Sequence, residues 1–173
     1  LGAGDMNLRM EEMIRAMGVD GDFRLIYATG KRYYDQVREN LADVKSPRLD
    51  LREYIYDMPK VMAAADVVLC RAGASTISEL TYLGKPAVIV PSPNVVNHHQ
   101  EKNARVLQEA GAAKMLLEGE FTGEDLFRTV EELLRDPAAM AAMHEASAAM
   151  GVQDATDRIT SILLGLAEKG GSK

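Results

Sequence analysis

Cysteine, tryptophan and long apolar runs are scarce or absent in this sequence. With one cysteine and no tryptophan, the chain cannot form an internal disulfide, and we expect it to work in a reducing compartment such as the cytoplasm. It has no run of about 18 apolar residues, so we expect no transmembrane segment, and no signal peptide is visible. Basic residues are also in the minority, since 20 Lys and Arg face 26 Asp and Glu. That balance argues against nucleic acid as the main partner.

What is present is the composition of a folded domain, with 47% hydrophobic and 27% charged residues over 173 positions. This is enough for one domain with its own core. The chain opens on Leu1 rather than Met, which indicates a piece excised from a longer protein. A small-residue loop feeds a predicted helix from about Asp5 to Met17, so we expect a strand to precede Leu1 in the parent protein. Four methionines recur on one face of that helix, and we interpret them as core: Met6, Met10, Met13 and Met17.

The centre of the chain is a strand–helix–strand unit. Two short, β-branched apolar runs, 67–70 and 87–90, have the length of strands buried on both faces. The helix between them is predicted to start at Ser75 or Thr76 and to end near Gly84. A strand, a helix and a parallel strand make one βαβ unit.

Strands and helices also alternate in the rest of the chain. The other predicted strands span residues 23–28, 48–54 and 112–117, and the other predicted helices span 32–41, 57–65, 98–110, 122–135, 137–150 and 154–168. Such alternation with tight turns is typical of a parallel, doubly wound sheet, so the predicted fold class is α/β and Rossmann-like. No internal repeat or long linker is apparent, and we expect residues 1–173 to form one domain that includes the C-terminal helices.

The start of the central helix is the place best suited to ligand binding. A helix start leaves four backbone N–H groups unpaired at the positive end of the helix dipole. Small residues there, Gly73, Ala74, Ser75 and Thr76, let a phosphate or diphosphate approach those groups. In a parallel sheet the loop lies at the carboxyl ends of the strands, where ligands bind. The alternative is a packing turn without a ligand, and Thr76 with Glu79 has the spacing of a capping box.

Other short patterns are interpreted without ligands. Asp20-Gly21-Asp22 precedes a strand, at the wrong end of the sheet for a metal site, and Thr29-Gly30-Lys31 lacks the glycine spacing of a Walker loop. We therefore interpret both as turns. Cys70 is interpreted as a small buried hydrophobe and His144 as a surface residue. The adjacent His98-His99 pair has no third ligand in the sequence, so we expect no metal site.

Several stretches resemble one family along nearly the whole chain. They are RAGASTISEL, GKPAVIVPSPNVVNHHQEKNARVLQEAGAA, YATGKRYYDQV and YIYDMPKVMAAADVV, together with the opening LGA, which is similar to the end of a GGSxGA loop. On these residues the sequence resembles the MurG family of bacterial peptidoglycan glycosyltransferases. The resemblance implies a GT-B fold of two Rossmann-like domains, of which this chain matches only the C-terminal, donor-binding half. It also implies transfer of N-acetylglucosamine from UDP-GlcNAc to lipid I, making lipid II, by an inverting enzyme without metal or cofactor.

The same resemblance implies roles for individual residues. It assigns the Glu79 carboxylate to the ribose hydroxyls, and residues 73–76 to the diphosphate. The remaining implied contacts are Ile55 and Met58 with the uracil, and His99 and Gln100 with the sugar hydroxyls. Gly4 stands where the family usually has a basic residue. The catalytic residues are unknown, because the general base, the acceptor site and the membrane-associating surface are expected in the missing N-terminal domain. We therefore expect the isolated chain to be inactive.

Two alternatives stay open at this point. One is the donor domain of another UDP-sugar enzyme, an epimerase or a different glycosyltransferase. The other is a non-catalytic nucleotide-sugar-binding subunit that needs a partner chain. We expect the chain to be cytoplasmic, with the parent enzyme peripheral on the cytoplasmic face of the cell membrane.

Overall fold

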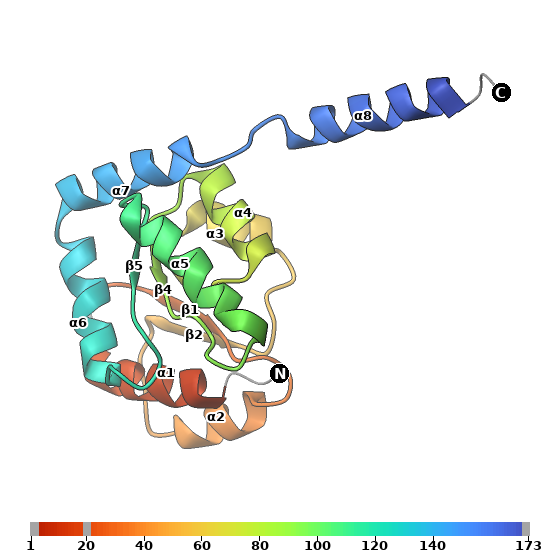
Figure 1. Cartoon of the computed structure of the whole chain (residues 1–173). Helices are drawn as coiled ribbons and strands as arrows, with labels where there is room; N and C mark the ends of the chain where they lie inside the picture. The colour runs from red at the N-terminus through yellow and green to blue at the C-terminus, as the bar shows by residue number, and fades with distance from the viewer. Residues whose placement is uncertain (1–3, 19–21, 171–173) are drawn as a thin grey trace.

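The computed structural model describes residues 4–18 and 22–170, in which short strands alternate with helices (Figure 1). The strands there are β1 Leu25–Ala28, β2 Leu49–Arg52, β3 Val68–Cys70, β4 Ala87–Ile89 and β5 Ala113–Met115. The helices are α1 Gly4–Met17, α2 Tyr34–Asn40, α3 Met58–Ala64, α4 Ala74–Leu83, the 3₁₀ helix η1 Val96–His98, α5 His99–Glu109, α6 Gly123–Leu134, α7 Pro137–Ala149 and α8 Ala155–Gly170. Each of the α-helices and strands predicted from the sequence is present, with small shifts at the ends.

All of the recorded strand pairs are parallel. β1 pairs with β2, with Leu25 opposite Leu49, while β4 lies between β3 and β5, with Val88 opposite both Leu69 and Lys114. Parallel neighbours need a crossover, and a helix provides it between β1 and β2, between β3 and β4, and between β4 and β5. Within the described residues no hydrogen-bonded ladder joins β1 to β3, so the strands form two parallel groups.

Helices cover both faces of β4. Successive side chains of a strand point to opposite faces. Val88 and Val90 join a hydrophobic cluster with side chains of α1 and α6, whereas Ala87 and Ile89 join a second cluster with side chains of α3, α4 and α5. All four side chains are fully buried. The predicted α/β, doubly wound fold is therefore confirmed.

The methionine face of α1 is part of the core, as the sequence predicts. Met6, Met10, Met13 and Met17 are each no more than 9% exposed, and α1 packs against α6. The unbranched thioether side chains can fill irregular gaps between two helices. The α1 face is therefore explained by packing.

The C-terminal helix α8 extends away from the other elements (Figure 1). One of its faces exposes large apolar side chains at helical spacing: Ile159, Ile162, Leu163 and Leu166. Across the ranges that the structure describes, no helix has both the length and the apolar character needed to cross a membrane.

Candidate functional site

Two loops follow the carboxyl ends of the neighbouring strands β3 and β4. One connects β3 to α4, and the other leads from β4 to η1 and α5. Helix α5 is tied to both loops: Asn103 Nδ2 donates a hydrogen bond to the Ala72 carbonyl at 3.2 Å, and Gln100 Oε1 accepts one from the Ser92 N–H at 3.0 Å. Ligands of open parallel sheets bind outside the carboxyl ends of the strands. These two loops therefore bound the candidate site.

Helix α4 starts without a side-chain cap. Its N-cap is Gly73, with φ −70° and ψ 145°, and no side chain bonds the first-turn amides. The N–H groups of residues 74–76 therefore have no acceptor within the described part of the chain. A Cβ on Gly73 would lie an ordinary 3.8 Å from Thr76 Oγ1, so neither the backbone nor internal packing demands glycine. The missing side chain leaves the amides open to a group that arrives from outside.

The predicted helix start at Ser75 or Thr76, with its capping box, is wrong. The Gly73 carbonyl already accepts a hydrogen bond from the Ile77 N–H at 3.0 Å, so α4 begins at Ala74 and Glu79 falls in the second turn. A capping box needs its acid in the first turn. Glu79 is exposed, and its carboxylate makes no hydrogen bond or ion pair with any residue that the structure describes. Its side chain is therefore not committed to capping the helix.

Glu79 and Met58 line the same groove, which has a volume of about 750 Å³ and is bounded by α3, α4 and residues from Met150 to Thr156 at the start of α8. Met58 is the first residue of α3 and is 39% exposed. Ile55, just before that helix, is only 8% exposed and does not line the groove. Met58 can therefore contact a ligand through its side chain, whereas Ile55 can offer little more than its backbone. Residues 73–76 and 99–100 also lie outside the groove lining, at the two loops described above.

The first turn of α5 follows a strained backbone segment. Asn97 and His98 both have positive φ, 55° and 49°, a conformation that costs a residue with a side chain about 1–3 kcal/mol. The His99 ring then bonds the Val96 carbonyl at 2.9 Å, and since a carbonyl only accepts, His99 Nδ1 carries the proton. His99 is exposed and Gln100 is partly buried. His99 and Gln100 therefore lie beside the loop that follows β4, and the Gln100 side chain is hydrogen-bonded to that loop.

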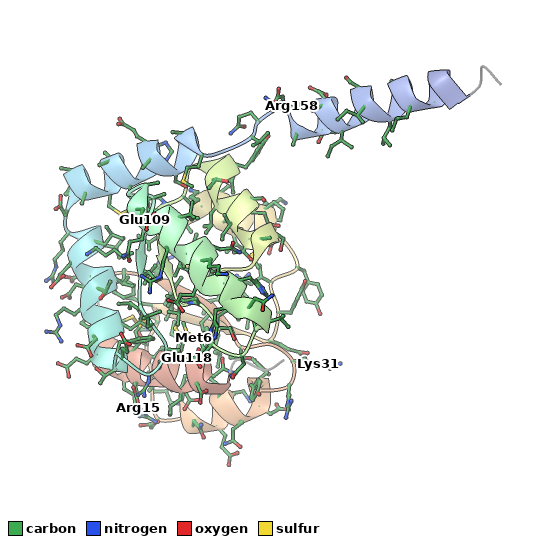
Figure 2. The ribbon with its side chains drawn as sticks, viewed as in Figure 1. Met6, Arg15, Lys31, Glu109, Glu118 and Arg158 are labelled. Atoms are coloured by element: carbon green, nitrogen blue, oxygen red, sulfur yellow. The ribbon has the colours of Figure 1, made fainter. Side chains whose placement is uncertain are left out.

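One polar contact at these loops was not predicted from the sequence. Arg71 Nη1 donates to the Glu118 carboxylate, and also to the carbonyls of Val90 and Pro91 at 3.2 and 3.3 Å. Glu118 follows β5 and is labelled in Figure 2. In the sequence, the position of Arg71 directly after an apolar strand is the one signal for such a contact. Its partner stands 47 residues later, and it cannot be identified before the strand order is known.

The acidic turn before β1 has a structural explanation. Asp22 forms an ion pair with Arg135 at 2.6 Å, and the guanidinium lowers the pKa of the Asp22 carboxyl. Asp20 and Gly21 lie outside the described residues, as do residues 1–3 with their resemblance to a glycine loop. Among the residues that the structure describes, no three His, Cys, Asp or Glu side chains come together where they could hold a metal ion.

Cys70 and His144 also have surroundings that explain them without chemistry. Burial raises the pKa of the Cys70 thiol to about 12, so the reactive thiolate is scarce near neutral pH. His144 Nδ1 bonds the Gly84 carbonyl at 2.5 Å, where Gly84 ends α4 in a left-handed conformation with φ 61°. His144 is exposed, as predicted, whereas Cys70 is only partly buried and not fully enclosed.

The arrangement is suited to binding an anion by backbone groups. The uncapped first-turn amides of α4 lie at the positive end of its dipole, directly after Gly73. The nearest strand-end cation, Arg71, is already paired with Glu118, so the attraction comes from the amides and the dipole. The Glu79 carboxylate, which has no hydrogen-bond or ion-pair partner among the described residues, lies one turn further along the same helix. Together they offer donors for phosphate oxygens and an acceptor for hydroxyl groups.

Comparison with known proteins gives consistent matches along the chain. A family model, the glycosyltransferase family 28 C-terminal domain, matches residues 1–159. The UDP-N-acetylglucosamine--N-acetylmuramyl-(pentapeptide) pyrophosphoryl-undecaprenol N-acetylglucosamine transferase of Acetivibrio thermocellus is 42% identical over 162 residues, which are 94% of this chain and 44% of that protein. The like-named transferase 2 of Bacillus thuringiensis is 40% identical over 169 residues, 97% of this chain and 46% of that protein.

A solved structure agrees with these matches. The crystal structure of Acinetobacter baumannii MurG has a TM-score of 0.79 and 27% sequence identity, over 95% of this chain and 49% of that chain. This chain thus spans about half the length of the relatives that it matches.

Proposed function

Because this chain belongs to the family of glycosyltransferase family 28 C-terminal domains, we propose that it binds the UDP-GlcNAc donor of an N-acetylglucosamine transferase. The observation that carries the proposal is the uncapped start of α4 at the carboxyl ends of β3 and β4. The names of the relatives support a transferase over an epimerase or a non-catalytic subunit.

The diphosphate of the donor is proposed to sit on the first turn of α4. The amides of Ala74, Ser75 and Thr76 have no acceptor among the described residues, and Gly73 has no side chain to block them. Donors that are fixed in place before the reaction stabilise the negative charge that builds on the leaving UDP, without reorganising. This chain's own contribution to catalysis is therefore leaving-group stabilisation by backbone groups.

The nucleoside and the sugar are proposed to lie on either side of the diphosphate. Glu79 accepts hydrogen bonds from the ribose hydroxyls, since its carboxylate has no partner among the described residues and shares a groove with Met58. Met58 and the backbone of Ile55 hold the uracil. His99 and Gln100, on the first turn of α5, orient the sugar hydroxyls. No metal or cofactor is part of this proposal.

The complete reaction is proposed to need the part of the protein beyond this chain. The relatives are about twice as long as the matched region, and their names include an undecaprenol-linked acceptor. We assign the acceptor site for lipid I, the general base and the membrane-associating surface to the additional domain. The parent enzyme would then make lipid II for peptidoglycan at the cytoplasmic face of the cell membrane, where its lipid acceptor is anchored.

Calorimetric titration of this chain with UDP, UDP-GlcNAc and uridine tests the donor proposal. We expect saturable binding of both nucleotides, and much weaker binding of uridine, which lacks the diphosphate. GDP is the matched control for the base, because it carries the same diphosphate on a purine. Absence of heat with UDP at millimolar concentration would contradict the proposal.

A further inference from the structure

The Arg71 side chain joins the ends of three strands. It leaves the end of β3, its Nη1 donates to the carbonyls of Val90 and Pro91 after β4, and the same nitrogen contacts the Glu118 carboxylate after β5. The two side chains are largely enclosed, with 24% of Arg71 and 11% of Glu118 exposed. One guanidinium nitrogen therefore fixes the relative positions of the loops on which the candidate site is built.

The loop that carries Arg71 is the loop that starts α4. Ala72 follows at once and is fully buried, and its carbonyl accepts the hydrogen bond from Asn103. Gly73 then caps the helix. Held by Arg71 at one end and by Ala72 in the middle, the loop has little freedom before the first amide of α4. The contacts of Arg71 and Ala72 therefore lie directly before the first-turn amides of α4.

Stability alone does not explain an enclosed ion pair at this place. Removing water from two charges costs free energy that their attraction returns only in part, and well-packed apolar side chains often stabilise a fold as well or better. An apolar pair could not, however, hold the two carbonyls of Val90 and Pro91. The Arg71–Glu118 pair therefore serves mainly to fix the relative positions of the segments that follow β3, β4 and β5.

We propose that Arg71 and Glu118 are positioning residues, a clamp that orients the first-turn amides of α4 toward the donor diphosphate. This inference rests on the proposed function for the identity of the ligand, but the orientation of the amides can be measured without one. Glu118 acts through Arg71, and Arg71 acts through the loop. Neither side chain needs to touch the nucleotide.

The test compares Glu118→Gln, which keeps the shape of the side chain and removes its charge, with the unaltered chain. In ¹H–¹⁵N NMR spectra without ligand, we expect the amide signals of residues 73–75 to shift or broaden while signals of α1 and α6 stay in place. UDP should bind more weakly, because the amides are then no longer held in position and must be ordered when the diphosphate binds. Uridine should bind as before, because it does not use the amides. Asp43→Asn is the control, since it breaks the Arg15–Asp43 ion pair at the turn after α2, and it should change none of these signals or affinities.

A double-variant comparison tests whether the two residues act as one unit. If they do, Arg71→Gln combined with Glu118→Gln should weaken UDP binding no more than the weaker-binding single variant. The clamp is refuted if Glu118→Gln leaves the signals of residues 73–75 unchanged, or if UDP and uridine binding fall together with the melting temperature. If the unaltered chain fails to bind UDP, the proposed function fails, and the ligand-free spectra still decide the clamp.

Discussion

The Glu12 carboxylate accepts a hydrogen bond of 2.8 Å from the backbone N–H of Gly123. This bond joins α1 to the first residue of α6, 111 positions later in the chain. The start of α6 also carries its own capping box, in which the side chains of Thr122 and Asp125 bond each other's backbone N–H groups. These contacts fix α1 against the N-terminal end of α6, the first of the C-terminal helices.

Gly123→Ala is expected to destabilise the fold strongly. A Cβ at this position would lie 2.6 Å from the Met13 nitrogen and 2.8 Å from the Arg9 carbonyl oxygen, so α1 and α6 would have to move apart. Overpacking of this kind costs about 1–3 kcal/mol, occasionally more. Urea unfolding followed by circular dichroism measures the change. Gly165→Ala on α8, where a Cβ meets no neighbour within 4 Å, is the matched control and should not lower stability.

Glu12→Gln is expected to flatten the acid side of the stability profile. Hydrogen bonds from Arg9 and from the Gly123 N–H lower the pKa of Glu12 in the folded chain below its ordinary value of 4.5. A lowered folded-state pKa adds stability above the unfolded-state pKa, and this stability is lost as the pH falls through the folded-state value. The stability difference between the two chains should therefore be larger at pH 7 than at pH 3. A constant difference at both pH values would contradict this role of the charge.

Glu79→Ala is expected to weaken UDP binding and to leave stability nearly unchanged. Its carboxylate has no partner among the described residues and does not cap α4, so removing it breaks no internal contact that the structure records. Hydrogen bonds to a charged group contribute about 1.5–3 kcal/mol, which corresponds to a loss of tenfold or more in affinity. Titration calorimetry and thermal unfolding measure the two quantities. Glu132→Ala, another exposed helical glutamate, is the control; undiminished binding by the Glu79 variant would remove the ribose assignment.

Extending the chain upstream is expected to stabilise it. Within the described residues, β1 and β3 are edge strands of two separate parallel groups, and an edge leaves a row of N–H and C=O groups unpaired. We propose that a strand from the parent sequence before Leu1 pairs there and joins the two groups. A chain lengthened by that segment should have a higher melting temperature and slower amide exchange in β1 and β3. An unchanged exchange rate in both strands would show that the edges are not filled in this way.

The sequence predicts the fold well because the signals are local. The β-branched runs around Leu69 and Ile89 and the methionine face of α1 each follow from the spacing of apolar residues. The end of α4 at Gly84, with φ 61°, follows from the common use of glycine to end helices. These patterns need no knowledge of distant residues.

The details of the site are harder to predict because they depend on distant or competing contacts. Helix α4 starts at Ala74 because Gly73, in the loop that follows β3, takes the N-cap position, although Ser is the stronger N-cap. The partnership of Arg71 with Glu118 depends on the order of the strands. The roles of Ile55, Met58, His99 and Gln100 come from resemblance, and they stay predictions.

The most direct test of the central claim is a ¹H–¹⁵N NMR titration of this chain with UDP. The claim is that the backbone amides at the start of α4 hold the diphosphate. We predict that the amide signals of Ala74, Ser75 and Thr76 show the largest downfield shifts, that they saturate with UDP, and that uridine does not reproduce them. Saturable UDP binding that leaves these three signals in place would contradict the account.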